Sequence, residues 1–176
     1  MKLYTHDRAV LLVDGANFHA TMKAHDCEID WRKLHEYFAQ RVQLQMAVYY
    51  TRTWNEVDDE TKEKDFRPLQ PLLDYLAYNS WKVVEKKTTD EKFRSTNLNV
   101  EMATDMISFG RGWLDLLIVC SGHGDLLYPT MRSQLHGTKV CIVSSLDPPM
   151  CSDALRREAI GFIDAKTLVP HIRREK

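Results

Sequence analysis

Three aspartates are the residues of this 176-residue chain whose positions suggest chemistry. Asp14 directly follows the apolar run AVLLV, and Asp125 follows the glycine-rich segment SGHG at the end of the run LDLLIVC. Asp105 lies in an amphipathic segment, with Glu101 four residues before it on the same helical face. Carboxylates brought together repel one another unless a cation lies between them, and the hard cations Mg²⁺ and Mn²⁺ prefer oxygen ligands. The aspartates therefore predict a metal site for phosphate chemistry, where the cation polarises a phosphodiester and helps to generate hydroxide from water.

Each aspartate also has an ordinary structural explanation. Asp14 can belong to a turn, Asp125 can be a helix N-cap and Asp105 can be a solvated helix residue, because aspartate is common at such positions. Asn17, three residues after Asp14, can hold a carboxylate or a scissile phosphate by hydrogen bonding. What favours a site is the joint placement of three acids at one edge of a predicted sheet.

Alternating apolar runs and amphipathic stretches predict the elements that would position these residues. The expected strands are 9–13, 44–51, 81–85, 114–120, 139–143 and 162–163, and the expected helices are 17–25, 31–41, 58–79, 99–109, 125–136 and 152–160. Asp30 is the expected N-cap of helix 31–41, and Pro68 and Pro71 are expected to kink or split helix 58–79. This alternation predicts an α/β fold, with a parallel sheet covered by helices on both sides. Ligands of such folds bind beyond the carboxyl ends of the strands, where the strand order reverses.

Composition limits the class of protein. The chain has 44% hydrophobic and 28% charged residues, and its formal net charge of −1 excludes a globally basic nucleic-acid binder. No window approaches the roughly 18 apolar residues of a membrane helix. Asp7 and Arg8 are unlike a secretory signal, and the four cysteines lack CxxC spacing and are expected to be reduced core thiols. We therefore expect a cytoplasmic protein with a single domain over 1–176, comprising a core at about 9–168, a short N-terminal lead and a basic C-terminal tail.

No other catalytic motif is complete. SGHGD is not a nucleophile elbow, since its serine precedes both glycines, and the glycine-rich motifs of dinucleotide and P-loop sites are absent. Segment 86–96 is expected to be a loop, and it carries the local basic cluster Lys86, Lys87, Lys92 and Arg94. This segment is either an ordinary solvated loop or one that grips phosphate beside the metal site. Trp54 is either a base-stacking residue or a partly buried loop anchor.

Four segments resemble, in order, motifs of the NYN domain: VLLVDGANF, NVEMATDMI, LLIVCSGHGDLLYPTM and CSDALRREAIGFIDAKTL. NYN domains are PIN-like ribonucleases and RNA-associated proteins that include the LabA-like bacterial group. The resemblance runs from about residue 9 to residue 168. It implies a three-layer PIN-like fold, with a mainly parallel sheet of about five strands and acids at its carboxyl edge. It also implies a Mn²⁺ or Mg²⁺ cofactor and a single-stranded RNA partner, and it is compatible with a homodimer.

The resemblance assigns family positions to Asp14, Asn17, Asp105 and Asp125. Two positions depart from the family, because Asn99 replaces the aspartate of a V-D-V step and His123 replaces an aspartate of the SGDxD segment. Asn99 keeps an oxygen ligand but loses a charge, for which Glu101 can compensate. His123 offers a nitrogen that Mn²⁺ tolerates better than Mg²⁺. It can instead act as a general base or phosphate contact, or be a hydrogen-bonded residue of a decayed site.

Two main hypotheses follow. The first is a metal-dependent ribonuclease, in which Asp14, Asp105 and Asp125 hold the metal, Asn17 and Asn99 position substrate or ligands, His123 assists, and Lys86, Lys87, Lys92 and Arg94 contact the RNA backbone. The second, motivated by the two replaced acids, is a catalytically impaired NYN-domain protein that binds RNA or a protein partner. A phosphatase or other small-phosphate enzyme on a similar sheet is a third possibility, but no motif supports it.

Overall fold

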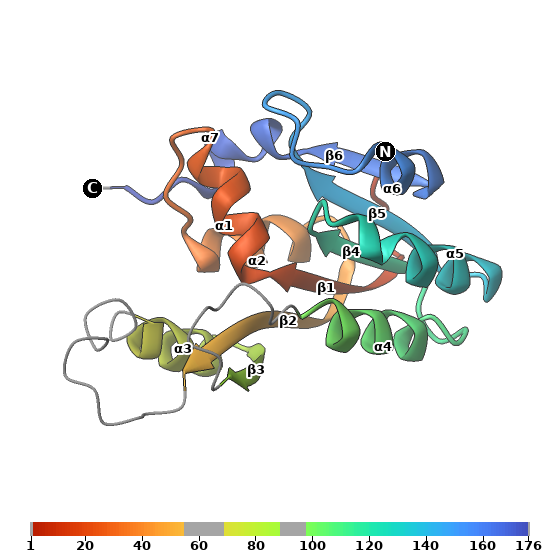
Figure 1. Cartoon of the computed structure of the whole chain (residues 1–176), viewed down its shortest axis with the longest axis horizontal. Coiled ribbons are helices and arrows are strands. Elements are labelled where there is room, and N and C mark those ends of the chain that lie inside the picture. Colours follow the sequence, from red (N-terminus) through yellow and green to blue (C-terminus); the bar gives the residue numbers. More distant parts are fainter. Residues whose placement is uncertain (1, 55–68, 89–97, 176) are drawn as a thin grey trace.

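A six-stranded parallel sheet forms the centre of the computed structural model, which describes residues 2–54, 69–88 and 98–175 (Figure 1). The strands are β1 Arg8–Asp14, β2 Gln43–Trp54, β3 Trp81–Thr88, β4 Leu116–Cys120, β5 Lys139–Ser144 and β6 Gly161–Asp164. Their order in the sheet is β3-β2-β1-β4-β5-β6, so the strand order reverses between β1 and β4. The predicted α/β fold is confirmed. The sheet has six strands where the resemblance implied about five.

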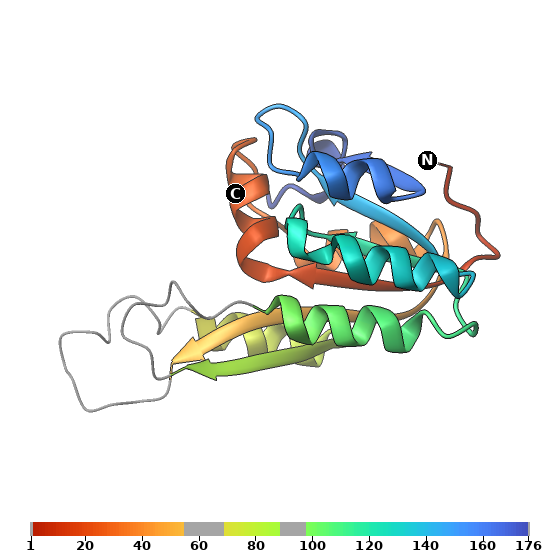
Figure 2. The same cartoon turned by 45° about the vertical axis from the view of Figure 1, so that its right-hand side comes forward.

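Helices cover both faces of the sheet. One face carries α1 Gly15–Lys23, α2 Trp31–Ala39, α3 Leu69–Tyr78 and α7 Val169–Ile172, which follows the short 3₁₀ helix η2 Ala165–Thr167. The other carries α4 Asn99–Phe109, the 3₁₀ helix η1 Gly124–Leu126, α5 Leu127–Leu135 and α6 Asp153–Glu158. Figure 2 shows α4, α5 and α6 side by side along that second face. The sheet is therefore the middle of three layers.

Strand β1 is buried on both sides because its residues alternate between two hydrophobic cores. Leu11 and Val13 pack on the side of α1 and α2, whereas Val10 and Leu12 pack on the side of α4 and α5. A strand buried on both faces is a continuous apolar run rather than an alternating one. This burial fixes the position of Asp14, the last residue of the strand, which is only 8% exposed.

The structure corrects the expected loop at 86–96. Strand β3 continues through Lys86 and Lys87, whose register partners in β2 are Arg52 and Thr53. The charged sequence does not indicate this pairing of β3 with β2, because a strand at the edge of a sheet can carry charged, exposed side chains and needs no apolar pattern. Lys92 and Arg94, at which the sequence placed further RNA contacts, lie outside the described residues.

The bounds of several helices also differ from the expected ones, most clearly those of α1 and α3. Helix α1 begins at Gly15 rather than at residue 17, because Asp14 caps it. Of the expected helix 58–79, the structure describes α3 Leu69–Tyr78, with Pro71 in its first turn, where proline is tolerated. Residues 58–68, including Pro68, lie outside the described part. The Trp54 backbone ends β2, and its side chain is not among those described.

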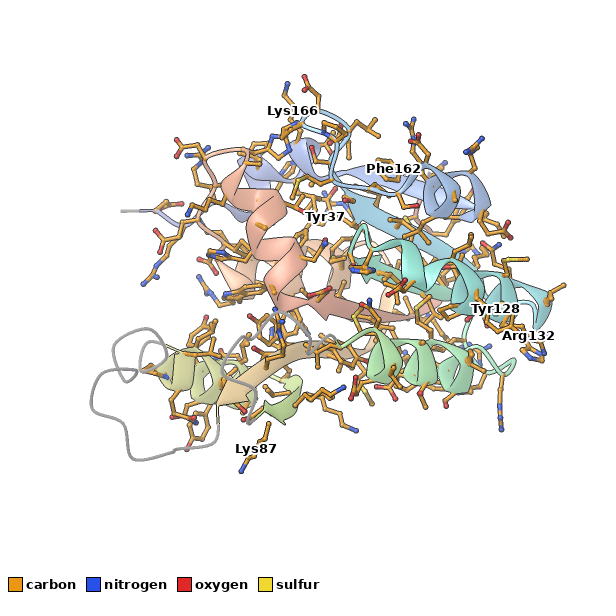
Figure 3. All side chains as sticks on the ribbon, in the orientation of Figure 1. Tyr37, Lys87, Tyr128, Arg132, Phe162 and Lys166 are labelled. Atoms are coloured by element: carbon orange, nitrogen blue, oxygen red, sulfur yellow. The ribbon has the colours of Figure 1, made fainter. Side chains whose placement is uncertain are left out.

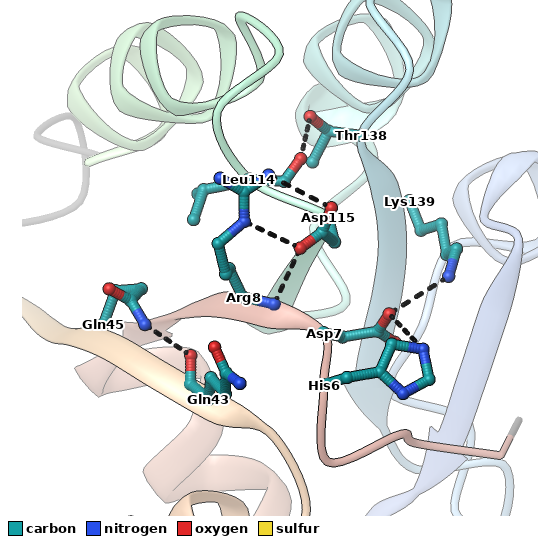
Figure 4. A network of polar contacts seen from close by, with 9 residues as sticks. All are labelled: His6, Asp7, Arg8, Gln43, Gln45, Leu114, Asp115, Thr138 and Lys139. Atoms are coloured by element: carbon teal, nitrogen blue, oxygen red, sulfur yellow. Dashed lines mark hydrogen bonds and ion pairs between the residues drawn. The ribbon is translucent and has the colours of Figure 1, made fainter.

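A polar network joins the strand starts at the amino edge of the sheet, opposite the predicted site (Figure 4). Asp115 accepts hydrogen bonds from the backbone nitrogen and Nε of Arg8, at 2.9 and 3.0 Å. The guanidinium of Arg8 lowers the pKa of the Asp115 carboxyl. Lys139 Nζ lies 3.4 Å from Oδ1 of the buried Asp7. These contacts link β1, β4 and β5 and support their common register.

The described helices include none with the length and apolar character needed to cross a membrane. All four cysteines are free thiols. Cys27, Cys120 and Cys141 are buried as expected, and burial raises the pKa of Cys141 to about 12. Cys151 is only half-buried, so the expectation of a core position is wrong for that residue.

Candidate active site

Asp14 lies where the strand order reverses. Its Oδ1 accepts a hydrogen bond from the backbone nitrogen of Asn17 at 3.1 Å, which caps α1. Its Oδ2 accepts from the hydroxyl of Ser121 at 3.4 Å, and Ser121 directly follows β4. The two strands that flank the reversal therefore meet through these two side chains. Ligands of doubly wound folds bind at this kind of position.

The turn after β4 is held tightly from two sides. The Oδ1 atom of Asn17 accepts a hydrogen bond from the backbone nitrogen of Gly122 at 3.0 Å. On the other side, the Gly122 carbonyl accepts from the backbone nitrogen of Ser152 at 2.9 Å. A Cβ atom at Gly122 would collide with the carbonyl oxygen of Met150 and lie 2.7 Å from Ser144 Oγ. Only glycine fits here, and the turn is fixed before any ligand binds.

Asn99 joins His123 to Asp125. It is the first residue of α4 and only 6% exposed, and its Nδ2 donates to Asp125 Oδ2 at 2.8 Å and lies 3.0 Å from His123 Nδ1. A carboxylate only accepts hydrogen bonds, so the amide of Asn99 must present its NH₂ group here. His123 Nδ1 is then the acceptor, which assigns the proton of the neutral imidazole to Nε2. Together these three residues form a closed polar network, here called the Asn99 network.

Asp105 is engaged elsewhere. Its Oδ2 accepts a hydrogen bond from the hydroxyl of Tyr50 at 2.7 Å. Tyr50 is fully buried in β2, and its register partner in β1 is Asp14. Burial, together with the hydrogen bond to Asp105 and its charge, raises the pKa of the Tyr50 hydroxyl well above its usual value. The hydroxyl therefore stays protonated and remains a donor.

The three aspartates do not form one ligand cluster. Asp14 contacts Ser121 and Asn17, Asp125 contacts Asn99, and Asp105 contacts Tyr50. Among residues 2–54, 69–88 and 98–175, no group of three His, Cys, Asp or Glu side chains could hold a metal ion. Their joint role as metal ligands stays a prediction. The residues that the structure brings together instead include both positions that depart from the family, Asn99 and His123.

The basic residues that are described lie on β3. Lys86 Nζ forms an ion pair with Glu101 Oε1 at 2.8 Å, which places Glu101 of α4 beside β3. Lys87 is exposed and projects outward from β3 (Figure 3). Since Arg52 is the register partner of Lys86, three cationic side chains lie at this end of β2 and β3. These cationic side chains lie further along the sheet than Tyr50 and its register partner Asp14, because β2 and β3 continue past the end of β1.

A groove of about 880 Å³ opens beside Asp14, on the face covered by α1 and α3. Its lining includes Gly15, His19, Tyr49 and Tyr75. A Cβ atom at Gly15 would lie 2.5 Å from the ring of Tyr49, so glycine permits this ring to pack against the start of α1. Burial, and next the charge of Asp14, raise the pKa of Tyr49 to about 12.

Sequence reasoning missed Tyr50 and Ser121 as members of the site. Tyr50 lies within the run LQMAVYYT, where it is indistinguishable from a core residue. Ser121 begins the motif SGHGD and was considered only as a nucleophile, although its position directly after the strongest strand places it beside Asp14. That position was the signal that could have found it.

The fold and the side chains at the carboxyl edge of the sheet define the class: a doubly wound α/β protein with acidic, amide and imidazole groups where the strand order reverses. The chain belongs to the NYN domain family, whose model matches residues 8–168. A search of curated proteins found no match. This family is PIN-like and supports assignment to the nucleases, which are hydrolases.

One solved structure shares the fold. A protein of unknown function from Vibrio parahaemolyticus is similar, with a TM-score of 0.71 and 20% identity over 93% of this chain and 96% of that chain. At this identity the likeness concerns the fold alone. A pyrazinamidase/nicotinamidase from Streptococcus mutans has a TM-score of 0.37 at 10% identity, over 89% of this chain and 99% of that chain. A score this low supports no argument about function.

Proposed function

We propose that this chain is a ribonuclease that hydrolyses phosphodiester bonds of single-stranded RNA with Mn²⁺ or Mg²⁺ at the carboxyl edge of the sheet. Membership of the NYN domain family supports the reaction class. The observation that carries the proposal is the placement of Asp14, joined to Ser121 where the strand order reverses. Folds of this class bind phosphate-bearing ligands at the point where the strand order reverses.

Two of the aspartates have carboxylate oxygens that a hard divalent cation could use as ligands. Each oxygen of Asp14 accepts one hydrogen bond, and a carboxylate oxygen has a second lone pair. The side chain of Asp125 is 62% exposed, so water and ions reach it. In this proposal Asp14, Asp105 and Asp125 hold the metal, which requires the three carboxylates, each with its own partner in the structure, to come together on the cation. It also requires Asp105 to act through the oxygen that Tyr50 does not bind. A bound cation would polarise the phosphodiester and lower the pKa of a coordinated water.

The polar side chains of the chain have their own roles in the proposal. Ser121 and the backbone of Asn17 orient Asp14. The Oδ1 atom of Asn17 is occupied by Gly122, so its Nδ2 group is the part that can donate to a phosphate oxygen. His123 carries its proton at Nε2, and its side chain is 45% exposed, so it can donate to a second phosphate oxygen.

The cationic end of β2 and β3 would contact the RNA backbone. Arg52 lies two positions beyond Tyr50 in β2, and Lys86 lies two positions beyond Val84, the register partner of Tyr50 in β3. Two positions correspond to roughly 7 Å along a strand. Positive side chains beyond an acidic edge attract the phosphates that flank the scissile bond. Lys87 points to the opposite face of β3 from Lys86 and is proposed to contact RNA from there. Lys92 and Arg94 are proposed to contact RNA from outside the described residues.

A cleavage time course on mixed-sequence single-stranded RNA tests this function. It compares Mn²⁺, Mg²⁺ and EDTA, with Asp14→Asn purified in the same way. We expect cleavage that requires both the metal and Asp14. Absence of cleavage with every cation, on RNA and on single-stranded DNA, would overturn the proposal.

The completeness of the Asn99 network favours a second candidate function. The NH₂ group of Asn99 already hydrogen-bonds Asp125 and His123, so an uncharged amide takes the place that a cation would have in this part of the edge. A catalytically impaired NYN domain that binds RNA or a protein partner would have such a site. Restoring aspartate at Asn99 and His123 separates the two candidates. Cleavage that appears only in the doubly substituted protein would favour the binding function.

A further inference from the structure

The groove beside Asp14 has an aromatic and aliphatic lining. Its residues come from α1, the start of α2, the second half of β2, and α3. Leu69, Leu72 and Tyr75 line it from α3, and Trp31 lines it from α2. Trp31 is buried, whereas Tyr75 is 40% exposed and can pack its ring against a ligand. A lining of this kind suits a flat ring with apolar faces.

One buried hydroxyl in the groove is left without a hydrogen bond by the described residues. Tyr49 is only 4% exposed, and its ring packs edge-on against Trp31 at a centroid distance of 5.0 Å. Its hydroxyl has no hydrogen-bond partner within residues 2–54, 69–88 and 98–175. Burial, and next the charge of Asp14, raise the pKa of Tyr49 to about 12, so the hydroxyl stays protonated at neutral pH. A buried donor without a partner is unfavourable, and a ligand with polar atoms on its edge would supply one.

The same hydroxyl lies close to the carboxyl edge of the sheet. The ring of Tyr49 extends from β2 toward Gly15, where a Cβ atom would lie 2.5 Å from the hydroxyl. Gly15 directly follows Asp14. A nucleotide carries its base and its phosphate on one sugar, so a base beside Tyr49 can leave its phosphate at the edge that carries Asp14.

The charges around the groove suit a ring that is attached to a phosphate. Of the two acids in the lining, Glu28 forms an ion pair with Arg174 at 3.1 Å. The other, Asp30, caps α2, where the helix dipole offsets its charge. Arg52 adds positive charge where β2 passes the end of β1. The groove thus combines an apolar interior with a cation at its edge, as single-stranded nucleic acids require.

We propose that this groove binds one unpaired base of the RNA strand, with Tyr75 stacking on the base and the Tyr49 hydroxyl hydrogen-bonding its edge. This rests on the proposed function, because the phosphate of the same nucleotide would lie beside Asp14. The groove volume of about 880 Å³ is within the usual range for small-molecule sites. A base within a duplex is stacked and its pairing edge is occupied, so the groove selects single-stranded RNA.

RNA binding measured without cleavage tests the proposal. Fluorescence anisotropy in EDTA compares a short sugar–phosphate chain that has no bases with the same chain carrying a single base, which can slide to any register. We expect the natural protein to bind the chain with one base about tenfold more tightly, the effect of one base–aromatic stack. Tyr75→Ala should bind the two chains alike. Tyr49→Phe, which keeps the ring, should reduce the difference about threefold.

Tyr78→Ala is the matched control, since Tyr78 lies one turn after Tyr75 on α3, is 89% exposed and is outside the groove lining. It should keep the natural difference between the two chains, and circular dichroism should show each variant folded. The proposal is overturned if the natural protein binds both chains equally, or if the difference persists in Tyr75→Ala or is undiminished in Tyr49→Phe. It is also overturned if free nucleoside monophosphates bind through Tyr75 and the RNA strand does not.

These outcomes are independent of the cleavage assay, because EDTA removes the metal. A protein that cleaves RNA but binds both chains equally keeps its proposed function and loses only the base-binding groove. A protein that distinguishes the two chains but cleaves no RNA keeps the groove and loses the proposed catalysis.

Discussion

The hydroxyl of Tyr50 donates a 2.7 Å hydrogen bond to Oδ2 of Asp105, an aspartate that the sequence assigns to metal binding. The tyrosine ring is fully buried between the sheet and α4, and its strand neighbour in register is Asp14. This contact occupies one carboxylate oxygen of Asp105 and leaves the other oxygen available to bind a ligand. Asp105 therefore has a structural partner whatever its role in catalysis.

Removing the Tyr50 hydroxyl should destabilise the protein. We expect Tyr50→Phe to lower the free energy of unfolding by roughly 1.5 to 3 kcal/mol, the range for a buried hydrogen bond to a charged group. Urea denaturation measures the change, and Tyr128→Phe, which alters a tyrosine that is 64% exposed, is the control. A double-mutant cycle with Asp105→Asn should show the two effects to be coupled. Equal stabilities of Tyr50→Phe and the natural protein would mean that the contact contributes nothing.

Substitutions at Asp14 should separate its capping role from its chemical role. Asparagine is also a good N-cap, so Asp14→Asn should keep most of the stability, whereas Asp14→Ala should lose about 1 kcal/mol. Both should abolish metal-dependent cleavage, because both remove the carboxylate. Asp30 caps α2 in the same manner, through a hydrogen bond from the backbone nitrogen of Lys33 at 3.0 Å, so Asp30→Asn is the matched control and should retain cleavage. Cleavage by Asp14→Asn at the natural rate would contradict the proposed role.

The predictable parts of the molecule are those encoded by local pattern. The run AVLLV identified β1, and Asp14 at its end followed from the rule for parallel sheets. The contact between Tyr50 and Asp105 joins residues 55 positions apart, and no local pattern encodes it. The extension of β3 to Lys86 depends on a ladder with β2, which a charged sequence does not reveal.

The sequence identified residues of the candidate site, but it did not predict which of them contact one another. The sequence named Asn99, His123 and Asp125, but treated the first two as departures that weaken a three-aspartate site. The structure joins these three through the NH₂ group of Asn99. Which end of an amide faces a neighbour depends on the hydrogen bonds around it, so spacing in the sequence could not predict this network.

Gly122 should tolerate no larger residue. A Cβ atom there would meet the carbonyl of Met150, Cys151 Cα at 2.7 Å and Ser144 Oγ at 2.7 Å, so the turn after β4 would have to move. We expect Gly122→Ala to cost about 2 kcal/mol or more and to reduce cleavage, measured by urea denaturation and by the RNA assay. Gly124→Ala is the control within the same turn, since its new Cβ would come no closer than 3.3 Å to Ser152 Oγ. If both variants behave alike, the crowding at Gly122 does not control the site.

His35 should make the stability depend on pH. Burial, beside the ring of Trp81 at a centroid distance of 5.9 Å, lowers the pKa of His35 below its ordinary value of 6.5, and this outweighs the opposite effect of Glu36. The folded protein therefore takes up a proton on His35 less readily than the unfolded chain does. The stability that this difference in the pKa of His35 contributes is fully present above the pKa of His35 in the unfolded chain. It falls as the pH drops below about 6.5.

Urea denaturation at about pH 7.5 and about pH 5.5 measures this effect of His35. We expect the natural protein to lose more stability between the two values than His35→Gln does, because glutamine does not titrate. His136→Gln, which removes an exposed histidine, should keep the natural pH dependence. An identical pH dependence in His35→Gln and the natural protein would show that His35 is protonated equally in the folded and unfolded states, contrary to its burial against Trp81.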